Sequence, residues 1–323
     1  MKLPALFNPS NDMALATNLR QYFPPRRIQQ MEDDLASLAQ LWDSGPWGWS
    51  LATKQRYLRM GIPENELPSD AWLAEVRRLS SRKFGVDYYR AYMTYKTYET
   101  HEAHELLPCQ ARFCTSLPDL EFLIFNFSLL IIKAPWSSSG RGNIVIKNFD
   151  KFLKRRIESI IREQGGIVVE PFYANKALDF AMEFEVSDKS TEFIGYSVFS
   201  TDETGHYGGN LVKSQEELQS LIDLPQTLLE NLIDYHRGEL SKLAYRGPVG
   251  IDMMRLADGR VHPCVEINFR MTMGLLAILL YNKGIRDDQW LTPYQPDRFT
   301  AGIRNGCLCI STPQSVKPSA TTS

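Results

Sequence analysis

The sequence predicts a mixed α/β fold in which helices pack on short strands. Apolar runs of strand length, Leu129–Lys133 and Ile167–Glu170, flank a segment after Asp150 whose apolar residues recur with helical spacing. A long hairpin, Val249–Arg270, turns at Asp258-Gly259 and indicates a pair of antiparallel strands. Helices between strands, together with antiparallel hairpins, are typical of α+β lobes.

The composition excludes several classes of protein. The chain has 323 residues, of which 43% are hydrophobic and 23% charged, and its net charge is −2. This is an ordinary globular balance, and it gives no reason to expect nucleic acid or an anionic membrane as a partner. The longest apolar run, LEFLIFNFSLLII, is too short to span a bilayer. The N-terminus has no sustained hydrophobic signal, and the five cysteines contain no C-x-x-C pair. We therefore expect a cytoplasmic protein.

The N-terminal residues predict a strand followed by a helix. Leu3–Phe7 is apolar enough for a buried strand, and a helix is expected from about Met13, with Asn8 as N-cap and Pro9 at the first helical position. The turn between them has two interpretations that the sequence leaves open. It either caps the helix or forms part of a substrate site at the carboxyl end of the strand. The polar side chains concerned are Asn8, Asn11 and Asp12.

The middle of the chain predicts elements in a clear order. Residues 20–70 are rich in Trp, Pro and Arg and are expected to be irregular. The aromatic run Arg82–Glu105 and the run Pro118–Phe125 predict helices. Strands are expected at Leu129–Lys133, Asn143–Lys147 and Ile167–Glu170. Asp150 can cap the helix between the last two, and Gly165-Gly166 can end it.

Further signals predict two later helices. Ser214 and Glu217 have the spacing of a capping box, and a second helical stretch after Leu228 is expected to end at Gly247. The polar segment at the end of the sequence predicts disorder.

The loop between the strands ending at Lys133 and beginning at Asn143 is unusual for a hairpin. It contains three serines, two glycines and Arg141, whereas a hairpin turn needs only two to five residues. Serine and glycine provide N–H and hydroxyl donors that can approach phosphate closely. The loop is not a Walker A loop, and neither a dinucleotide-binding nor a kinase motif is present. It therefore predicts either a phosphate-covering lid or a disordered hairpin tip.

The last hairpin carries a candidate metal site. Glu266 and Asn268 lie two residues apart and face the same side of a strand. A bulge at Pro263 would place Asp252 opposite Glu266. Oxygen ligands of this kind suit Mg²⁺, or Mn²⁺ in its place, shared with nucleotide phosphates. Arg270 continues the same face and could contact a phosphoryl group. The alternative is an ordinary exposed strand face.

These elements occur in an order that resembles the ATP-grasp superfamily: a lysine, a strand and a Ser/Gly hairpin, then I-V-V-E-P-F-Y, then D…E-x-N-x-R. The resemblance covers about Lys83 to Gly274. It implies an ATP-grasp fold, in which two α+β lobes clasp ATP, preceded by a small N-terminal α/β domain. The implied domains are 1–80 for the N-terminal domain, 81–168 for the first lobe with the phosphate loop, 169–304 for the second lobe with the metal site, and 305–323 for a short strand and tail.

The resemblance also implies roles for single residues. Lys83, or Lys96 in its place, resembles the first nucleotide lysine, and Lys133 resembles the second. Asp179 resembles the acidic residue that contacts the ribose, and Arg270, with Lys133 and Arg141, would act on the transferring phosphoryl group. The implied phosphate loop comprises Ser137, Ser138, Ser139, Gly140 and Gly142. The implied adenine-binding segment comprises Glu170, Pro171, Phe172 and Tyr173. The implied magnesium ligands are Asp252, Glu266 and Asn268.

The resemblance implies an ATP- and Mg²⁺-dependent ligase. A substrate carboxylate would become an acylphosphate, and an amine or other nucleophile would attack it. The implied partners are small-molecule carboxylates and amines, and a homodimer is left open. Asn8, Asn11, Asp12 and, in a glycine-rich loop, His206 are the candidate substrate residues. The alternatives are a nucleotide-binding sensor or scaffold without turnover and an ATP-grasp kinase that phosphorylates a hydroxyl.

Overall fold

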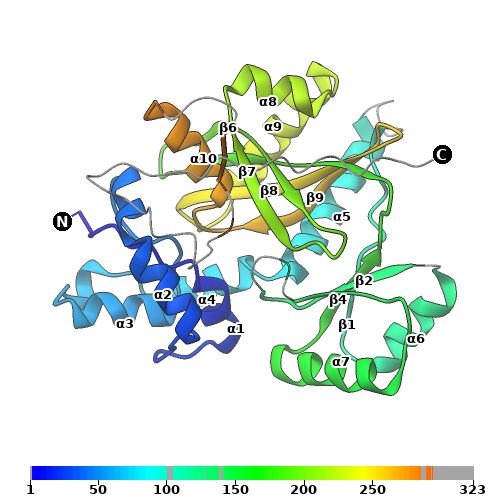
Figure 1. The fold of residues 1–323 in the computed structure, drawn as a ribbon, viewed down its shortest axis with the longest axis horizontal. Coiled ribbons are helices and arrows are strands. Elements are labelled where there is room, and N and C mark those ends of the chain that lie inside the picture. Colours follow the sequence, from blue (N-terminus) through cyan, green and yellow to red (C-terminus); the bar gives the residue numbers. More distant parts are fainter. Residues whose placement is uncertain are drawn as a thin grey trace.

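The computed structural model describes residues 2–99, 105–127, 129–137, 140, 142–284, 289–291 and 293. It confirms the mixed α/β fold class. Two antiparallel sheets form the body of the molecule, one of four strands in the order β1-β4-β2-β3 and one of six in the order β10-β7-β6-β5-β8-β9. Figure 1 shows the smaller sheet and its helices at one end of the molecule and the larger sheet at its centre.

The first lobe is built on the four-stranded sheet. Its strands are β1 (Arg112–Cys114), β2 (Leu130–Lys133), β3 (Asn143–Val145) and β4 (Ile167–Pro171). Helices α6 (Leu117–Asn126) and α7 (Lys151–Gln164) cover its outer face (Figure 1). The predicted caps of α7 are confirmed. The Asp150 side chain accepts a hydrogen bond from the Leu153 amide, and Gly165 ends the helix with φ 80°. These helices bury Leu120 and Ile157 against the sheet.

The second lobe is built on the six-stranded sheet. Its strands are β5 (Lys176–Val186), β6 (Thr191–Thr201), β7 (Tyr207–Val212), β8 (Gly247–Leu256), β9 (Val261–Asn268) and β10 (Gln289–Leu291). Helices α5 (Arg82–Glu99), α8 (Gln215–Ile222) and α9 (Gln226–Ser241) supply its main core. The predicted capping box of Ser214 and Glu217 is confirmed. The helix after Leu228 ends at Ser241 rather than at Gly247, which begins β8.

The N-terminal part differs from the expectation. Leu3–Phe7 does not form a strand, and the only pairing there in the described chain is an isolated bridge between Leu6 and Pro46. Residues 20–70, expected to be irregular, contain several helices. The elements before the first lobe are α1 (Asn11–Thr17), α2 (Arg26–Asp34), η1 (Ala36–Leu41), α3 (Leu51–Arg59), η2 (Glu64–Glu66) and α4 (Asp70–Leu79). Capping explains two of them, because Ser50 and Ser69 accept hydrogen bonds from the amides of Thr53 and Trp72.

The N-terminal part packs directly on the second lobe. Helix α10 (Met273–Asn282) is apolar around most of its circumference, and it lies between β6 and β7 on one side and Phe7 and Trp47 on the other. The Met271 amide donates to the Trp47 carbonyl at 2.8 Å. Across the described residues, we find no helix with the length and apolarity that a bilayer crossing needs.

Candidate active site

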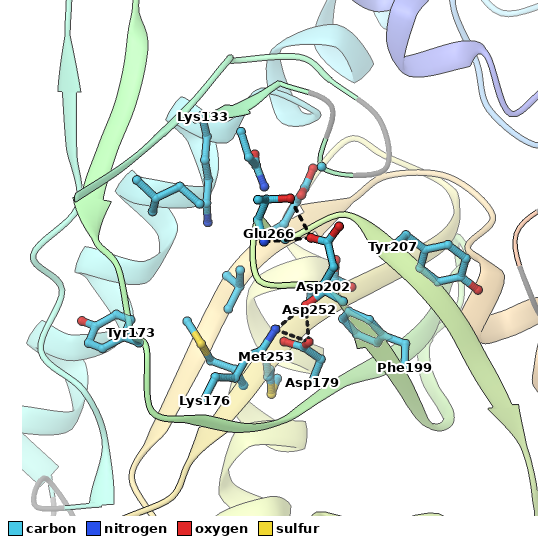
Figure 2. A pocket seen from close by; sticks show the side chains of 18 of the residues that line it. Lys133, Tyr173, Lys176, Asp179, Phe199, Asp202, Tyr207, Asp252, Met253 and Glu266 are labelled. Atoms are coloured by element: carbon cyan, nitrogen blue, oxygen red, sulfur yellow. Dashed lines mark hydrogen bonds and ion pairs between the residues drawn. The ribbon is translucent and has the colours of Figure 1, made fainter. Parts of the chain in front are cut away.

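A cavity of about 810 Å³ lies between the two lobes, a volume suited to a nucleotide-sized ligand. Figure 2 shows Lys133 and Tyr173 on one side, and Lys176, Asp179, Phe199 and Tyr207 from the second lobe on the other. Residues predicted for the site that line this cavity are Lys133, Ser137, Gly140, Glu170, Pro171, Phe172, Tyr173, Asp179, Asp252, Glu266, Asn268 and Arg270.

On the first-lobe side, a buried ion pair joins two neighbouring strands. Lys133 of β2 pairs with Glu170 of β4, and both side chains are 7% exposed. His262 Nε2 lies 3.8 Å from the second Glu170 oxygen. Burial alone would raise the pKa of Glu170, but the positive charge of Lys133 and the contact with His262 outweigh it and lower the pKa to about 2. The carboxylate thus remains ionised and fixes the ammonium of Lys133 in the cavity wall.

A second polar group lies where the lobes join. The chain passes from β4 through Phe172 and Tyr173 into β5, and the Phe172 amide donates to the Leu129 carbonyl at 3.0 Å. The Asp179 carboxylate accepts hydrogen bonds from Lys176 Nζ and Thr201 Oγ1, each at 2.6 Å. A carboxylate, an ammonium group and a hydroxyl therefore line this part of the cavity.

The predicted carboxylate pair is confirmed. Asp252 of β8 pairs with Glu266 of β9, and the register then shifts so that Met254 pairs with His262. The irregularity therefore falls in residues 263–265, which include the expected Pro263. Burial and the nearby carboxylates of Glu266 and Glu183 raise the pKa of Asp252 well above its usual value. A cation bound there would relieve this repulsion.

Arg270 connects this pair to the N-terminal helices. Its Nη2 donates to Asn268 Oδ1 at 2.8 Å, and Asn268 Nδ2 donates to Asp252 Oδ2 at 3.1 Å. On its other side, Arg270 Nε donates to both Asp12 oxygens, at 2.9 and 3.0 Å. Asp12 therefore contacts a site residue rather than the large cavity, which it does not line.

Arg82, at the start of α5, is a site residue that the sequence analysis missed. One of its terminal nitrogens donates to the Ala134 carbonyl and the Ser137 hydroxyl, both at 2.7 Å. The other donates to Glu266 Oε2 at 2.8 Å. Arg82 thereby joins the loop that was predicted to cover phosphate, in the first lobe, to the carboxylate pair of the second. The resemblance to the family assigned a role to the next residue, Lys83. No local pattern in the sequence shows that Arg82, rather than Lys83, contacts the site.

Other predicted residues lie away from the cavity. The Lys83 ammonium lies 5.3 Å from the centre of the Phe113 ring, and Lys83 does not line the cavity. Gly142 packs against Ser137 at the base of the loop, since a Cβ there would lie 2.5 Å from Ser137 Oγ. His206, in the β6–β7 turn, contacts Thr204 and Asp202. Lys96 lies on α5. The predicted Ser138, Ser139 and Arg141 fall outside the described residues.

The capping prediction at the N-terminus is also corrected. Ser10, not Asn8, precedes α1, and Asn8 Nδ2 instead donates to the Gly48 carbonyl at 2.9 Å and to Thr53 Oγ1 at 3.1 Å. Asn11 is 1% exposed and packs against Gly48. Neither asparagine lines the cavity.

Lys176 and Glu183 are among the cavity-lining residues that were not predicted. Lys176 lies three residues after Tyr173, the last residue of the predicted adenine-binding segment, so its position could have suggested a role. Glu183 lies on β5 four residues after Asp179, on the same face of the strand, but no strand was predicted there. It is 1% exposed and accepts hydrogen bonds from Ser197 Oγ at 3.0 Å and Thr272 Oγ1 at 2.8 Å. Burial raises the pKa of Glu183 to about 7.

Comparison with known proteins gives one curated relative and several similar structures. No family model matches the chain. The relative is a [butirosin acyl-carrier protein]–L-glutamate ligase of Niallia circulans, 25% identical over 169 residues, which are 50% of this chain and 38% of the relative. The chain thus spans less than half of the length of that protein.

Two solved structures illustrate the structural similarity. Biotin carboxylase from Campylobacter jejuni, in complex with an ATP analogue, has a TM-score of 0.48 and 13% identity over 76% of this chain and 56% of that one. N5-carboxyaminoimidazole synthetase from Staphylococcus aureus, complexed with ADP, has a TM-score of 0.47 and 11% identity over 86% and 78%.

The curated relative is a ligase of the kind that the motif order predicted. The antiparallel sheets of the two lobes agree with the fold which that order implied. The fold and the relative together confirm the predicted resemblance of this chain to the ATP-grasp superfamily.

Proposed function

We propose that the protein is an ATP- and Mg²⁺-dependent ligase. It transfers the γ-phosphoryl group of ATP to a substrate carboxylate, which releases ADP and leaves an acylphosphate. An amine or other nucleophile then attacks the acyl carbon, forms the new bond and displaces phosphate.

One observation carries the proposal: a single cavity brings together Lys133 from the first lobe and Asp252, Glu266, Asn268 and Arg270 from the second. Cations and metal ligands on facing walls can neutralise the charge of a transferring phosphoryl group. In this arrangement Lys133 binds a phosphate oxygen, and the backbone of Glu170–Tyr173 contacts the adenine. Asp179, oriented by Lys176 and Thr201, accepts a hydrogen bond from the ribose.

The residues present fit a magnesium ion shared with phosphate. Two carboxylates and an amide offer hard oxygen ligands, and Mg²⁺ commonly binds through one or two carboxylates and substrate phosphates. Among the described residues, no group of three or more His, Cys, Asp or Glu side chains could hold a metal ion. When bound, the ion supplies positive charge to the phosphate oxygens. Asn268, held by Arg270, orients Asp252 for it.

The two substrates are proposed to be a carboxylic acid and an amine, at least one of them a small molecule. The curated relative joins L-glutamate to an acyl-carrier protein, so a carrier-bound substrate belongs to the same proposal. A nucleotide-binding sensor without turnover has less need of a complete set of metal ligands and an arginine such as Asp252, Glu266, Asn268 and Arg270. A kinase would give a phosphorylated alcohol in place of an amide, and product analysis separates the two enzymes.

Calorimetry with a non-hydrolysable ATP analogue tests the nucleotide site. We expect binding that strengthens on addition of Mg²⁺, and we expect Asp252→Asn to remove most of that strengthening. The exposed Asp258→Asn, on the same hairpin but in its turn, is the matched control and should bind like the wild type. An absence of binding at millimolar concentrations, with and without Mg²⁺, contradicts the proposal.

A further inference from the structure

Glu183 is a buried carboxylate in the wall of the cavity. Both of its oxygens accept hydrogen bonds from hydroxyls, Ser197 Oγ at 3.0 Å and Thr272 Oγ1 at 2.8 Å. Within the part of the chain that the structure describes, no lysine, arginine or histidine forms an ion pair with it. Buried charges in proteins are as a rule paired, because burial without a partner costs several kcal/mol. Its position in the cavity wall makes it available to a positively charged group of a ligand.

The surroundings of Glu183 are shaped to keep this carboxylate in place. A Cβ on Gly274 would lie 2.2 Å from Glu183 Oε1 and from Ser197 Oγ, and a Cβ on Gly250 would lie 2.7 Å from Glu183 Oε2. Only glycine at both positions leaves room for the carboxylate and its two hydroxyl donors. These three side chains come from β5, β6 and the start of α10, so the group is held by rigid elements.

The chemistry of the group suits an ammonium ion better than a metal. An ammonium group has three donors, and the carboxylate and two hydroxyl oxygens here offer acceptors in one small volume. Magnesium demands near-octahedral geometry from six oxygen ligands, whereas this group offers one carboxylate and two hydroxyls. Both hydroxyls can continue to donate to Glu183 while accepting from the ligand; Thr272 Oγ1 also accepts from the Leu275 amide at 2.9 Å and keeps one lone pair for the ligand.

The location also suits the amine of a ligation reaction. Across β5 and β8, Glu183 pairs with Gly250, two residues from Asp252, and Glu183, Asp252 and Arg270 all line the cavity. The group therefore lies on the same side of the cavity as the proposed phosphoryl-transfer residues, near where an activated carboxylate would form.

We propose that Glu183, with Ser197 and Thr272, binds the ammonium group of the amine substrate. This inference rests on the proposed ligase function and narrows it: the amine substrate carries a primary amino group, as an amino acid does.

The test is calorimetry on the full chain with MgADP bound. The probes are the twenty common amino acids and ethanolamine, each amine that binds being compared with its hydroxy analogue, such as lactate for alanine. We expect at least one amine to bind about tenfold or more tightly than its hydroxy analogue. Glu183→Gln should lower the affinity for that amine at least tenfold and leave the affinity for MgADP within about twofold.

Two further variants separate a binding role from a structural one. Glu185→Gln makes the same change on the same strand at a residue that does not line the cavity, and it should bind the amine like the wild type. Ser197→Ala removes one hydroxyl and should weaken amine binding severalfold, so the inference is testable even if Glu183→Gln fails to fold. If MgADP binds but no amine does, or if Glu183→Gln and Ser197→Ala leave amine binding unchanged, the subsite is wrong. If MgADP itself does not bind, the proposed function is at fault.

Discussion

At the scale of single residues, the site consists of charges that would be costly to bury alone. Lys133 and Glu170 are both nearly inaccessible to solvent, and the charge of each offsets the cost of burying the other. Arg82 and Glu266 form a second such pair, in which Arg82 is 5% and Glu266 25% exposed. Function and stability are therefore coupled most strongly at Lys133 and Glu170, where both side chains are buried, and less at Glu266, which is partly exposed.

We expect Lys133→Met to abolish nucleotide binding and to destabilise the fold. The variant leaves Glu170 charged and buried, which costs about 3–5 kcal/mol of unfolding free energy. The double variant Lys133→Met/Glu170→Gln should recover most of that stability without recovering nucleotide binding. Urea denaturation and calorimetry measure the two effects. Wild-type affinity for the ATP analogue in either variant would show that Lys133 is only structural.

Glu266→Gln should act mainly on the metal. The change keeps the side-chain volume and removes the negative charge of one proposed metal ligand. The factor by which Mg²⁺ strengthens nucleotide binding should therefore fall roughly tenfold or more. The melting temperature should fall by only a few degrees, because Glu266 is partly exposed. A large fall in melting temperature with an unchanged Mg²⁺ response would instead make Glu266 a structural partner of Arg82.

At the scale of elements, the sequence predicted those with clear ends. Helix α7 was located by its cap at Asp150 and its C-terminal Gly165, and α8 by its capping box. The hairpin of β8 and β9 was located by its turn, and the bulge at Pro263 by the need to align two carboxylates. Residues close together in the sequence determine all of these features, so the sequence alone could predict them.

The longest strands were missed although β5 carries a readable pattern. In β5, Phe180, Met182 and Phe184 alternate with Asp179, Ala181 and Glu183, and the first three face the core. This alternation is typical of a strand, but the sequence analysis took only Asp179 from the segment, for its resemblance to a family residue.

The predicted strand Leu3–Phe7 failed in the opposite way. It is apolar because Leu6 and Phe7 pack in hydrophobic clusters, but no neighbouring strand pairs with it. Its backbone bonds go to a loop instead, through the Leu6 amide to the Gly45 carbonyl at 3.0 Å. Tertiary contacts of this kind leave no local pattern.

Helix α9 should make the second lobe sensitive to acid. His236 is fully buried, its Nδ1 lies 2.8 Å from Tyr88 Oη, and burial lowers its pKa from 6.5 to about 3. Between these two values the unfolded chain binds the extra proton, so stability is full above pH 6.5 and falls as the pH drops toward 3. The slope is at most about 1.4 kcal/mol per pH unit.

Urea denaturation at pH 7 and pH 5 measures this effect. We expect the wild type to lose about 2 kcal/mol from His236 alone and His236→Gln to lose correspondingly less over the same interval. His206→Gln, in an exposed turn, is the matched control and should keep the wild-type dependence. An equal pH dependence in wild type and His236→Gln would contradict the assignment.

At the scale of the whole molecule, the N-terminal helices hold the two lobes together at the site. Helix α4 contacts the first lobe, where the Arg77 guanidinium lies 3.8 Å from the centre of the Trp136 ring and Trp136 Nε1 donates to the Arg77 carbonyl at 2.9 Å. Helix α1 contacts the second lobe through Asp12 and Arg270. The N-terminal segment, which was expected to bind the substrate, thus also orients Arg270 through Asp12.

A double-mutant cycle tests this connection without any knowledge of the substrate. Asp12 and Arg270 are 12% and 16% exposed, so their interaction is shielded from water, and we expect a coupling energy of about 1–3 kcal/mol between Asp12→Asn and Arg270→Met. Asn11→Ala, a neighbour on α1 without a bond to Arg270, should combine with Arg270→Met additively to within about 0.5 kcal/mol. The coupling exists because Arg270 is bonded to Asp12 on one side and to Asn268 on the other. Asp12→Asn should therefore also weaken the Mg²⁺ enhancement of nucleotide binding, whereas Asn11→Ala should lower only the unfolding free energy. Additive effects of Asp12→Asn and Arg270→Met would mean that the N-terminal helices only cover the second lobe and take no part in the site.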